Sequence, residues 1–317
     1  MTIPDLSDAP EVSEPLPPPK PKVGFSRPDT RAGLLFVLPA VILLTVFIIV
    51  PFALAIGFSF TNQRLISPLA TRFVGFENYI DQLTDALFWK SLWNNARFSL
   101  FVVPVQTALA LGLAVLVNQK IKGRVAFRTI YFIPVTVVMA AAAVIWVLLF
   151  QQAGLINGFF EVITFGNFSP DWLDDPTWAM WAIIAVSMWQ GVGFQMIILL
   201  AALQDVPAEL YEAASIDGAD TWRQFRNVTL PGIRNQLIFV LTVTTILAMR
   251  LYDQPTLMPN TPGGPIDSTR TAMVHMIEIG YNRQAIGRGS TVAVIFFVIV
   301  LVLTLLQRRF LREGGAQ

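Results

Sequence analysis

Apolar residues along this chain are concentrated in six long runs separated by polar segments. About 20 predominantly apolar residues are needed to cross a hydrocarbon core of about 30 Å, and the runs meet or approach that length. They therefore predict six transmembrane helices and an all-α membrane protein. The expected bounds are Gly33–Phe60, Phe98–Val117, Thr129–Phe150, Trp178–Leu203, Asn235–Met249, with an outer end that the pattern leaves open, and Thr291–Leu306.

The segments that flank these runs define the expected domain organisation. Residues 1–32 are rich in proline and acids and include "PLPPPKPK", so they are expected to form a disordered cytoplasmic tail. Residues 33–312 are expected to form one transmembrane domain, with a cytoplasmic loop at 204–233, and residues 313–317 a C-terminal tail. A cleavable signal peptide has a short basic start and an apolar region of about 7–15 residues. Here a long acidic tail precedes a longer run, so the first run is expected to stay as an anchor.

Composition supports a membrane protein and excludes several other classes. Of the 317 residues, 54% are hydrophobic and 14% are charged, and the mean hydropathy is +0.59, whereas soluble domains carry about a quarter charged residues. A net charge of +1 without long runs of Lys and Arg gives no reason to expect nucleic acid as a partner. The chain has no Cys and a single His, His275, so disulfides, thiolate chemistry and a histidine metal cluster are not expected. The redox compartment stays open.

Lys and Arg are distributed unevenly between the two sides that six helices define. If the N-terminal tail is cytoplasmic, the inside segments hold 14 of the 22 Lys and Arg residues and the outside segments hold 8, although the outside segments are longer. Cytoplasmic loops retain positive charge, so both termini are expected in the cytoplasm. Residues 151–177 contain acids and no basic residue, and they are expected outside.

The six runs contain no Asp, Glu, Lys, Arg or His. Proton- or sodium-coupled carriers generally need an ionisable group within the membrane, so the pattern disfavours a secondary carrier. The nearest charges are Arg250 and Asp253, whose i, i+3 spacing would let them neutralise each other on one helix face; a functional role is the alternative. No nucleotide-binding GxxxxGK[ST] sequence occurs. Any ATP must therefore be hydrolysed by a partner, and the chain itself is not expected to be an enzyme.

The longest polar interruption in the C-terminal half, "ELYEAASIDGADTWRQFRNVTLP", has the pattern of a helix, a glycine turn and a second helix. Asp205 is expected to cap the first helix, and Gly218 is expected to end it with a positive φ. Asp220 is expected to cap the second helix, in which apolar residues recur at i, i+3 and i+6 from Trp222. The Ala-Ala pair lets a second surface approach closely. The segment is therefore expected to face a cytosolic partner.

Residues Glu212–Pro231 resemble the EAA loop of the inner-membrane subunits of bacterial ATP-binding-cassette importers. That loop reads Glu-Ala-Ala, three residues, Gly, nine residues, Ile, any residue, Leu-Pro, and Val228 stands here in place of the isoleucine. The resemblance implies that Glu212–Gly218 is a coupling helix seated in a cleft of a cytosolic ATPase. The residues expected at that contact are Glu212, Ala213, Ala214, Asp217, Gly218 and Ala219.

Further motifs, in the same order as in the family, resemble the maltose-type permease subunits of carbohydrate importers. They are "FVGFENY", "FRTIYFIP", "GLIN", "WQGVGFQM", "LQDVPAELYEAA" and "TPGGPIDSTRT", and the likeness covers about Gly33–Phe310. The resemblance implies a multi-pass protein of the bacterial inner membrane that works with a second permease subunit, two copies of a cytosolic ATPase and an extracytoplasmic sugar-binding protein. It implies no cofactor on this chain, with ATP and Mg bound by the ATPase.

A substrate path is expected near mid-membrane, where broken helices expose backbone groups to a cavity. The sequence "WQGVGFQ" supplies aromatic rings for the apolar face of a sugar, amides for its hydroxyls and glycines that open the backbone. By resemblance, Gly191 and Phe194 match contacts to bound sugar, and Thr244 matches the facing helix. On that helix, aliphatic residues stand where the maltose-type subunits have an aromatic ring and polar amides. This difference argues against maltose itself as the substrate. Packing is the alternative role for Trp189 and Phe194. The predicted path comprises Trp189, Gln190, Gly191, Phe194, Gln195, Thr244, Leu247, Ala248, Leu251, Tyr252 and Asp253.

The expected function is therefore a transmembrane permease subunit that translocates a carbohydrate, with an oligosaccharide favoured. The alternatives are a permease for a polyol or glycerol phosphate ester, a secondary carrier, and a non-transporting scaffold. An anionic ligand would need cavity arginines, of which only Arg250 is near. The "TPGGP" sequence is expected to form a turn that faces the binding protein, and His275 is expected on a helix surface.

Overall fold

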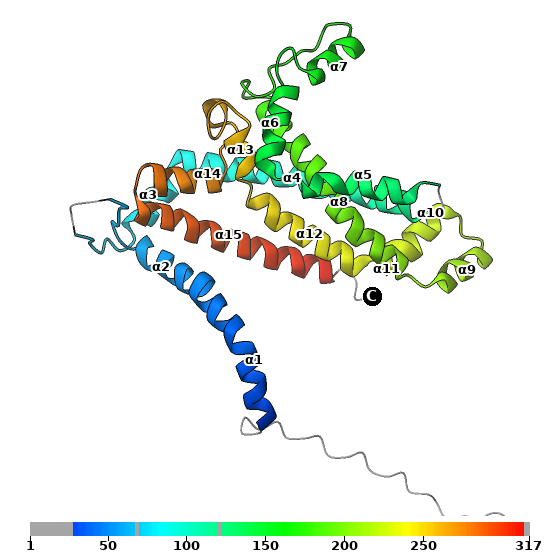
Figure 1. Cartoon of the computed structure of the whole chain (residues 1–317), viewed down its shortest axis with the longest axis horizontal. Helices are drawn as coiled ribbons and strands as arrows, with labels where there is room; N and C mark the ends of the chain where they lie inside the picture. Colours follow the sequence, from blue (N-terminus) through cyan, green and yellow to red (C-terminus); the bar gives the residue numbers. More distant parts are fainter. Residues whose placement is uncertain (1–27, 67–69, 120–121, 314–317) are drawn as a thin grey trace, which may run out of the picture. The chain divides into compact units, whose positions relative to one another are not determined.

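The computed structural model describes residues 28–66, 70–119 and 122–313, and in those ranges the secondary structure is helical (Figure 1). An isolated bridge between Thr61 and Phe73 is the one β-type pairing among the described residues. Residues 28–32 begin the first helix, while the rest of the predicted N-terminal tail lies outside the described residues. The chain divides into two compact units, with the boundary after Phe52.

One helical run makes up the described part of the first unit. α1 (Pro28–Leu44) continues through the π-helical turn η2 (Thr45–Ile49) into α2 (Val50–Ser59), whose last residues belong to the second unit. Residues Gly33–Ser59 are long and apolar enough to cross a membrane. This agrees with the first predicted span.

The second unit is a bundle of long helices with shorter helices at its ends. Its helices are α3 (Glu77–Thr84), α4 (Ala86–Asn118), α5 (Arg124–Thr136), α6 (Met139–Leu149), α7 (Leu155–Thr164), α8 (Ala179–Gln204), α9 (Ala208–Ile216), α10 (Thr221–Gln224), α11 (Leu230–Gly232), α12 (Arg234–Met249), α13 (Asp253–Leu257), α14 (Ala272–Ile277) and α15 (Ile286–Glu313). Short π-helical turns at Phe225–Thr229 and Glu278–Asn282 and a 3-10 turn at Pro265–Asp267 join them.

α8 is packed between α4 and α5, and α12 packs against α4, α8 and α15 (Figure 1). Small residues allow the close approach of α4 and α8, because Ala110 and Ala114 of α4 are fully buried in one apolar cluster with Met196 and Leu199 of α8. Between membrane helices, close packing of small residues is a main source of attraction. The core of the second unit therefore lies along α8.

Five helical segments in the described ranges are long and apolar enough to span a membrane, and a bent pair of helices supplies a sixth candidate. The number of spans agrees with the prediction, but several bounds differ; the last span, for example, begins at Ile286 instead of Thr291. α4 begins at Ala86 instead of Phe98, because Asp85 accepts a hydrogen bond from the Leu87 N–H at 2.8 Å and caps the helix. The fifth span reaches Leu257.

The third predicted span is two helices instead of one. α5 and α6 are bent by 101° at Val137 and Val138, which both have extended backbone conformations. Gln190 of α8 donates a hydrogen bond to the Val137 carbonyl at 3.1 Å, so a neighbouring helix satisfies a backbone group that the break frees. The predicted third span is therefore a bent pair of helices, and the position and size of its bend were not predicted, because this long-range bond leaves no mark on local hydrophobic periodicity.

Candidate functional site

α9 is the first helix of the predicted coupling segment. It ends at Ile216 and is followed by Gly218, which has a φ of +76°, and the Ala219 N–H donates to the Ala214 carbonyl at 2.9 Å across the turn. No atom lies within 4 Å of a Cβ built on Gly218, so the backbone angle alone favours glycine. The predicted glycine turn is confirmed. The predicted cap at Asp205 is wrong, because Asp205 continues the helical conformation of α8 and Pro207 precedes α9 without a side-chain cap.

The second half of the segment is fixed to the first by side-chain bonds. Asp220 caps α10 as predicted, because its Oδ1 accepts from the Arg223 N–H at 2.8 Å. A π-helical turn then replaces the regular helix from Phe225 onward. Gln224 Nε2 donates to Ser215 Oγ of α9 at 3.1 Å. The segment is thus a folded unit held by its own hydrogen bonds.

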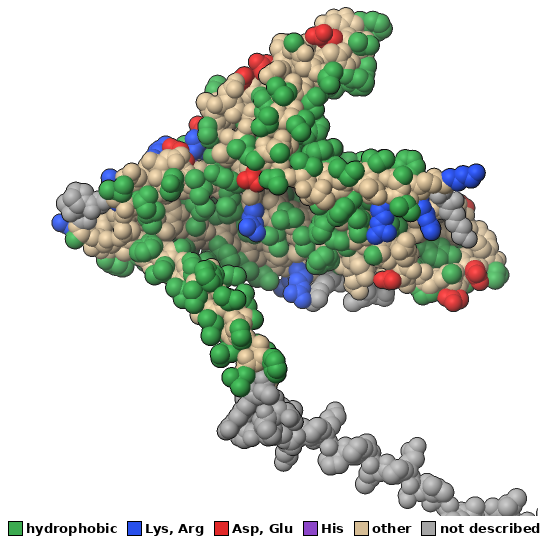
Figure 2. Space-filling view, in the orientation of Figure 1, with side chains coloured by type: hydrophobic (Ala, Val, Ile, Leu, Met, Phe, Trp, Pro, Cys, Tyr) green, Lys and Arg blue, Asp and Glu red, His purple; other side chains and the backbone are tan. Residues whose placement is uncertain are grey.

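The residues predicted to contact an ATPase lie on the surface of this unit. Glu212, Ala213, Asp217 and Gly218 are exposed, and Ala214 and Ala219 are half-buried. Two large apolar side chains, Ile216 and Trp222, are 87% and 67% exposed. Figure 2 shows charged side chains gathered at the end of the bundle that carries α9 and α10. Exposed apolar groups rimmed by charge are typical of a protein contact surface.

A cavity of about 560 Å³ opens among α4, α8, α12 and the segment that follows α12. This volume falls within the range of about 300–1,000 Å³ that is typical of small-molecule sites. Ten of the eleven residues of the predicted substrate path line it, namely Gln190, Gly191, Phe194, Gln195, Thr244, Leu247, Ala248, Leu251, Tyr252 and Asp253. The structure therefore brings together residues that the sequence separates by about fifty positions.

The polar groups of α8 at this cavity differ in what they bind. Gln190 Nε2 is engaged by the Val137 carbonyl at the break between α5 and α6. Gln195 Nε2 donates to Thr244 Oγ1 of α12 at 2.7 Å, while its Oε1 is buried and has no hydrogen-bond partner among the described residues. Phe194 remains 44% exposed. The cavity wall therefore contains a buried acceptor without a partner among the described residues and an exposed aromatic ring.

Trp189 is the one predicted path residue outside the cavity wall. Its ring packs edge-on against Trp146 of α6, with the ring centroids 5.3 Å apart, and both belong to an apolar cluster. Gly193 also faces elsewhere, because a Cβ built on it would overlap the Tyr131 carbonyl of α5. Gly193 lets α5 and α8 pack closely. It does not open the backbone to the cavity, whereas Gly191 does.

Sequence reasoning missed several cavity residues on α4, on α8 and beyond α12. Gln106, Ser187 and Gln254 are polar members of the wall. Gln106 is a lone amide within an apolar run, and polar residues inside membrane segments are rare and often functional. That isolation is the signal by which the residue could have been identified.

Arg250 and Asp253 line the cavity without neutralising each other. α12 ends at Met249, and Tyr252 has a φ of −137° and a ψ of −50°, so the two charges do not share one helix face. No ion pair within 4.0 Å joins them in the described part of the chain. The expected pairing was wrong because the helix ends between them. Their charges nevertheless sum to zero, so the described wall has no net charge.

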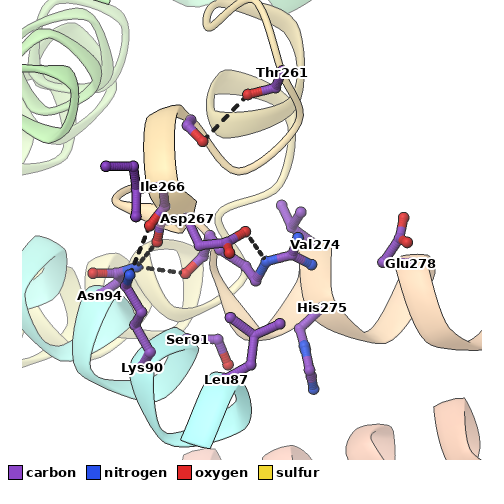
Figure 3. A network of polar contacts seen from close by, with 12 residues as sticks. Leu87, Lys90, Ser91, Asn94, Thr261, Ile266, Asp267, Val274, His275 and Glu278 are labelled. Carbon is purple, nitrogen blue, oxygen red and sulfur yellow. Dashed lines mark hydrogen bonds and ion pairs between the residues drawn. The ribbon is translucent and has the colours of Figure 1, made fainter. Parts of the chain in front are cut away.

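Polar side chains of α4 hold the loop that follows α13 (Figure 3). Lys90 Nζ donates to the Ile266 carbonyl at 2.6 Å, and Asn94 Nδ2 donates to the carbonyls of Asp267 and Arg270 at 3.0 and 2.9 Å. The predicted "TPGGP" turn is confirmed, since both of its glycines have positive φ. Ile266 and Asp267 also have positive φ values of 51° and 56°. The surrounding hydrogen bonds hold this strained backbone in place.

Asn95 joins three elements within the same network. The residue is fully buried, its Nδ2 donates to the Met249 carbonyl at 2.9 Å, and its Oδ1 accepts from the Ala272 N–H at 2.8 Å. Thr271 Oγ1 donates to the Leu251 carbonyl at 2.7 Å. Side chains from α4 and from the start of α14 therefore satisfy backbone groups freed where α12 ends, beside the cavity.

His275 is buried and not on a helix surface as expected. It is 1% exposed, its ring lies beside Phe88, and its Nε2 is 3.3 Å from Gln82 Oε1 and 3.7 Å from Asp85 Oδ2. The expectation was wrong because α3 and α4 contribute residues that cover α14. Burial lowers the pKa of His275 by more than the Asp85 carboxylate raises it.

These features define a class: a multi-span helical permease with a cavity among its membrane helices and an exposed helix–turn–helix at one end. The chain belongs to the family described as "Binding-protein-dependent transport system inner membrane component", which matches residues 106–313. The matched range contains both the coupling segment and the cavity helices α8 and α12. The predicted class, a permease subunit of an ATP-binding-cassette importer, is thereby confirmed.

Individual relatives extend over nearly the whole chain. It is 33% identical over 285 residues to the sulfoquinovosyl glycerol transport system permease protein SmoG of Agrobacterium fabrum, covering 90% of this chain and 91% of the relative. It is 34% identical over 278 residues to the trehalose/maltose transport system permease protein MalF of Thermococcus litoralis, covering 87% and 92%.

A solved structure supports the fold. A chain of a bacterial alginate ABC transporter, crystallised in complex with an alginate pentasaccharide-bound periplasmic protein, matches with a TM-score of 0.77 at 20% identity, covering 90% of this chain and 96% of that chain. The six-span importer permease fold expected from the sequence is confirmed at this level.

Proposed function

We propose that this chain is the transmembrane permease subunit of an importer that moves a carbohydrate, delivered by an extracytoplasmic binding protein, through the cavity. The observation that carries the proposal is the presence in one chain of a cavity lined by amides, a hydroxyl and an open aromatic ring, and of an exposed helix–turn–helix. The relative named for trehalose/maltose supports a sugar solute.

The energy for transport comes from two copies of a cytosolic ATPase that bind ATP and Mg. In this proposal both termini and α9 face the cytoplasm of a bacterial inner membrane, and α9 is seated in the ATPase. ATP draws the two ATPase copies together, and a rigid helix carries that movement into the bundle, which shifts between inward-open and outward-open packings. A second permease subunit completes the path around the solute.

The cavity chemistry favours an uncharged solute. Phe194 offers a ring face to the apolar side of a sugar, and Gln195 Oε1 offers an acceptor to a hydroxyl. Arg250 is balanced by Asp253 among the described wall residues. This balance argues against the alternative of a glycerol phosphate ester, which would require an excess of positive charge.

Reconstitution in liposomes tests the proposal, with labelled maltose, trehalose and lactose as probes. The isolated chain should neither hydrolyse ATP nor accumulate any of these sugars under a proton or sodium gradient. Addition of the second permease, the ATPase and the binding protein should produce ATP hydrolysis and uptake together, because the conformational cycle links them. An ATPase variant that cannot hydrolyse ATP is the matched control.

Gradient-driven accumulation by the isolated chain would contradict the proposal. It would establish a secondary carrier, and Arg250 and Asp253 would then be the first groups to examine for ion coupling.

A further inference from the structure

A buried amide on α4 lines the cavity without a hydrogen-bond partner. Gln106 is 5% exposed and belongs to the cavity wall, and its side-chain amide makes no hydrogen bond to any residue in the ranges 28–66, 70–119 and 122–313. Its amide has two N–H donors and an acceptor oxygen. Unpaired polar groups in low-dielectric surroundings are unfavourable, and native proteins rarely retain them unless water or a ligand pairs with them.

Gly191 of α8 makes room for this amide. A Cβ built on Gly191 would overlap the Nε2 and Cδ atoms of Gln106, which is a flexible side chain. The Cβ of any residue at 191 would therefore displace the amide. At Gly193, two residues along, the obstruction is the Tyr131 backbone carbonyl on α5. Gly193 permits helix packing, whereas Gly191 leaves space for a polar group at the cavity.

The second free group on this wall has a fixed chemical identity. Thr244 Oγ1 donates its hydrogen to the Val240 carbonyl at 2.7 Å, so it can only accept from Gln195. The atom of Gln195 that contacts it must therefore be Nε2, at 2.7 Å, and the unpartnered atom must be Oε1. Oε1 is an acceptor only, so its partner must be a donor.

We propose that Gln106 and Gln195 form a hydroxyl-recognition site for an uncharged sugar or polyol, with Gly191 as the positioning residue for Gln106. The inference rests on the proposed function, because it takes the cavity as the solute path. A sugar hydroxyl donates to Gln195 Oε1, and another hydroxyl donates to or accepts from the Gln106 amide. An ionised carboxylate has no hydrogen to give Oε1, so the pair distinguishes hydroxyls from carboxylates.

A thiol reporter tests this recognition without requiring transport. The chain has no Cys, so Ser187→Cys places a single thiol of this chain in the cavity wall. In the complete importer in nanodiscs, a methanethiosulfonate reagent should modify it, and maltose, trehalose or lactose should slow the modification. Acetate, an ionised carboxylate without a hydrogen to donate, should not. Mass spectrometry of this chain gives the modification rate, and Ala110→Cys, in the packed core of α4, is the buried control.

Substitutions in this reporter background test the two amides. Gln106→Met keeps most of the side-chain volume and removes the amide, so the half-protecting concentration of the protecting disaccharide should rise about 3- to 10-fold. Thr107→Val is the matched control, because Thr107 is the buried neighbour on α4, its hydroxyl is also unpartnered, and it does not line the cavity. An unchanged value in Gln106→Met, or an equal rise in Thr107→Val, would overturn the proposal.

A double substitution tests the positioning role of Gly191. Gly191→Ala should weaken protection by the sugar as much as Gln106→Ala does. The double variant should show the same protection as Gln106→Ala alone, because alanine at 106 is too short to clash with the Cβ at 191. Additive losses would show that Gly191 acts independently and would overturn the positioning role.

The two proposals fail in different ways. Protection that depends on Gln106 without ATP-driven uptake would support the recognition site and overturn the importer function. ATP-driven uptake together with a reporter thiol that none of the three sugars protects would support the importer function and overturn the recognition site.

Discussion

His275 places an ionisable ring where its charge is poorly solvated. The ring is buried, and its Nδ1 has no hydrogen-bond partner among the described residues. Burial is the largest influence and lowers the pKa of His275; Asp85 raises it, and Arg270 and Arg283 lower it. In the unfolded chain the histidine pKa is near 6.5. At a pH between the lowered pKa of the folded chain and this value, the unfolded chain therefore binds more protons than the folded chain does. The contribution of neutral His275 to the free energy of unfolding is therefore fully present above about pH 6.5 and declines as the pH falls.

His275→Gln should make stability less dependent on pH. Glutamine retains a hydrogen-bonding group beside Gln82 but does not titrate. Between pH 7.5 and 5.5 the wild type should lose more free energy of unfolding than the variant, with a difference of at most about 1.4 kcal/mol per pH unit. Thermal unfolding in detergent at both pH values measures this. Parallel pH dependence in the two proteins would contradict the assignment.

At this scale, local chemistry was predictable and long-range contacts were not. Asp220 and Asp205 both precede short polar helices, and the sequence pattern favours a cap at each. Asp220 caps α10, but Asp205 remains in the last turn of α8 because Pro207 separates it from α9. Gln190 and Gln195 were both predicted to serve a solute. Both line the cavity, but Gln190 Nε2 also donates to a backbone carbonyl of another helix, which no spacing along α8 reveals.

Among the elements, the coupling segment combines a rigid interior with an exposed surface. Hydrogen bonds across the Gly218 turn and between Gln224 and Ser215 fix α9 relative to α10. A rigid element can transmit a displacement, whereas a loose loop would absorb it. The geometry of this turn should therefore influence coupling more than it influences the fold of the bundle.

Gly218→Val should impair ATP-driven uptake while membrane insertion remains. Valine at a φ of +76° is strained by about 1–3 kcal/mol, although no neighbouring atom obstructs its Cβ. Gly158→Val on α7 is the matched control, because that position is equally open and has no positive φ. Uptake in proteoliposomes and the amount of inserted protein are measured together. Normal uptake in Gly218→Val would refute the coupling role.

The elements themselves were largely predictable because apolar runs report membrane length directly. The bounds of these elements were less predictable. The polar start of α4, from Ala86 to Arg97, breaks the apolar pattern, yet the Asp85 cap begins the helix there. Pro134 indicated an interruption of the third span, but the 101° bend follows from extended residues three positions later and from a bond to α8.

Across the second unit, α4 connects the cavity with the loop that follows α13. Gln106 lies at the cavity, Asn95 bonds both α12 and α14, and Lys90 bonds the loop (Figure 3). This arrangement could not be predicted from the sequence, because apolar periodicity does not specify which helices are neighbours. The predicted substrate path gave ten cavity residues on α8 and beyond, but none on α4.

Asn95→Ala should destabilise the whole unit. It leaves the Met249 carbonyl and the Ala272 N–H without their partner, and the free energy of unfolding should fall by about 1–3 kcal/mol. Asn118→Ala, at an exposed position near the other end of α4, should have little effect. Chemical unfolding in detergent monitored by circular dichroism measures both. Equal stability of the two variants would contradict a structural role for the Asn95 bonds.

The bond from Gln190 to the Val137 carbonyl has a consequence for biogenesis. Its two ends are 53 residues apart in the chain, and at about 5–20 residues per second a ribosome needs roughly 3–10 s to make the intervening segment. During that interval the third span has reached the insertion machinery without the donor that its bent form uses. The bond can form only after α8 has been made, so the third span cannot complete its final form until the fourth span is present.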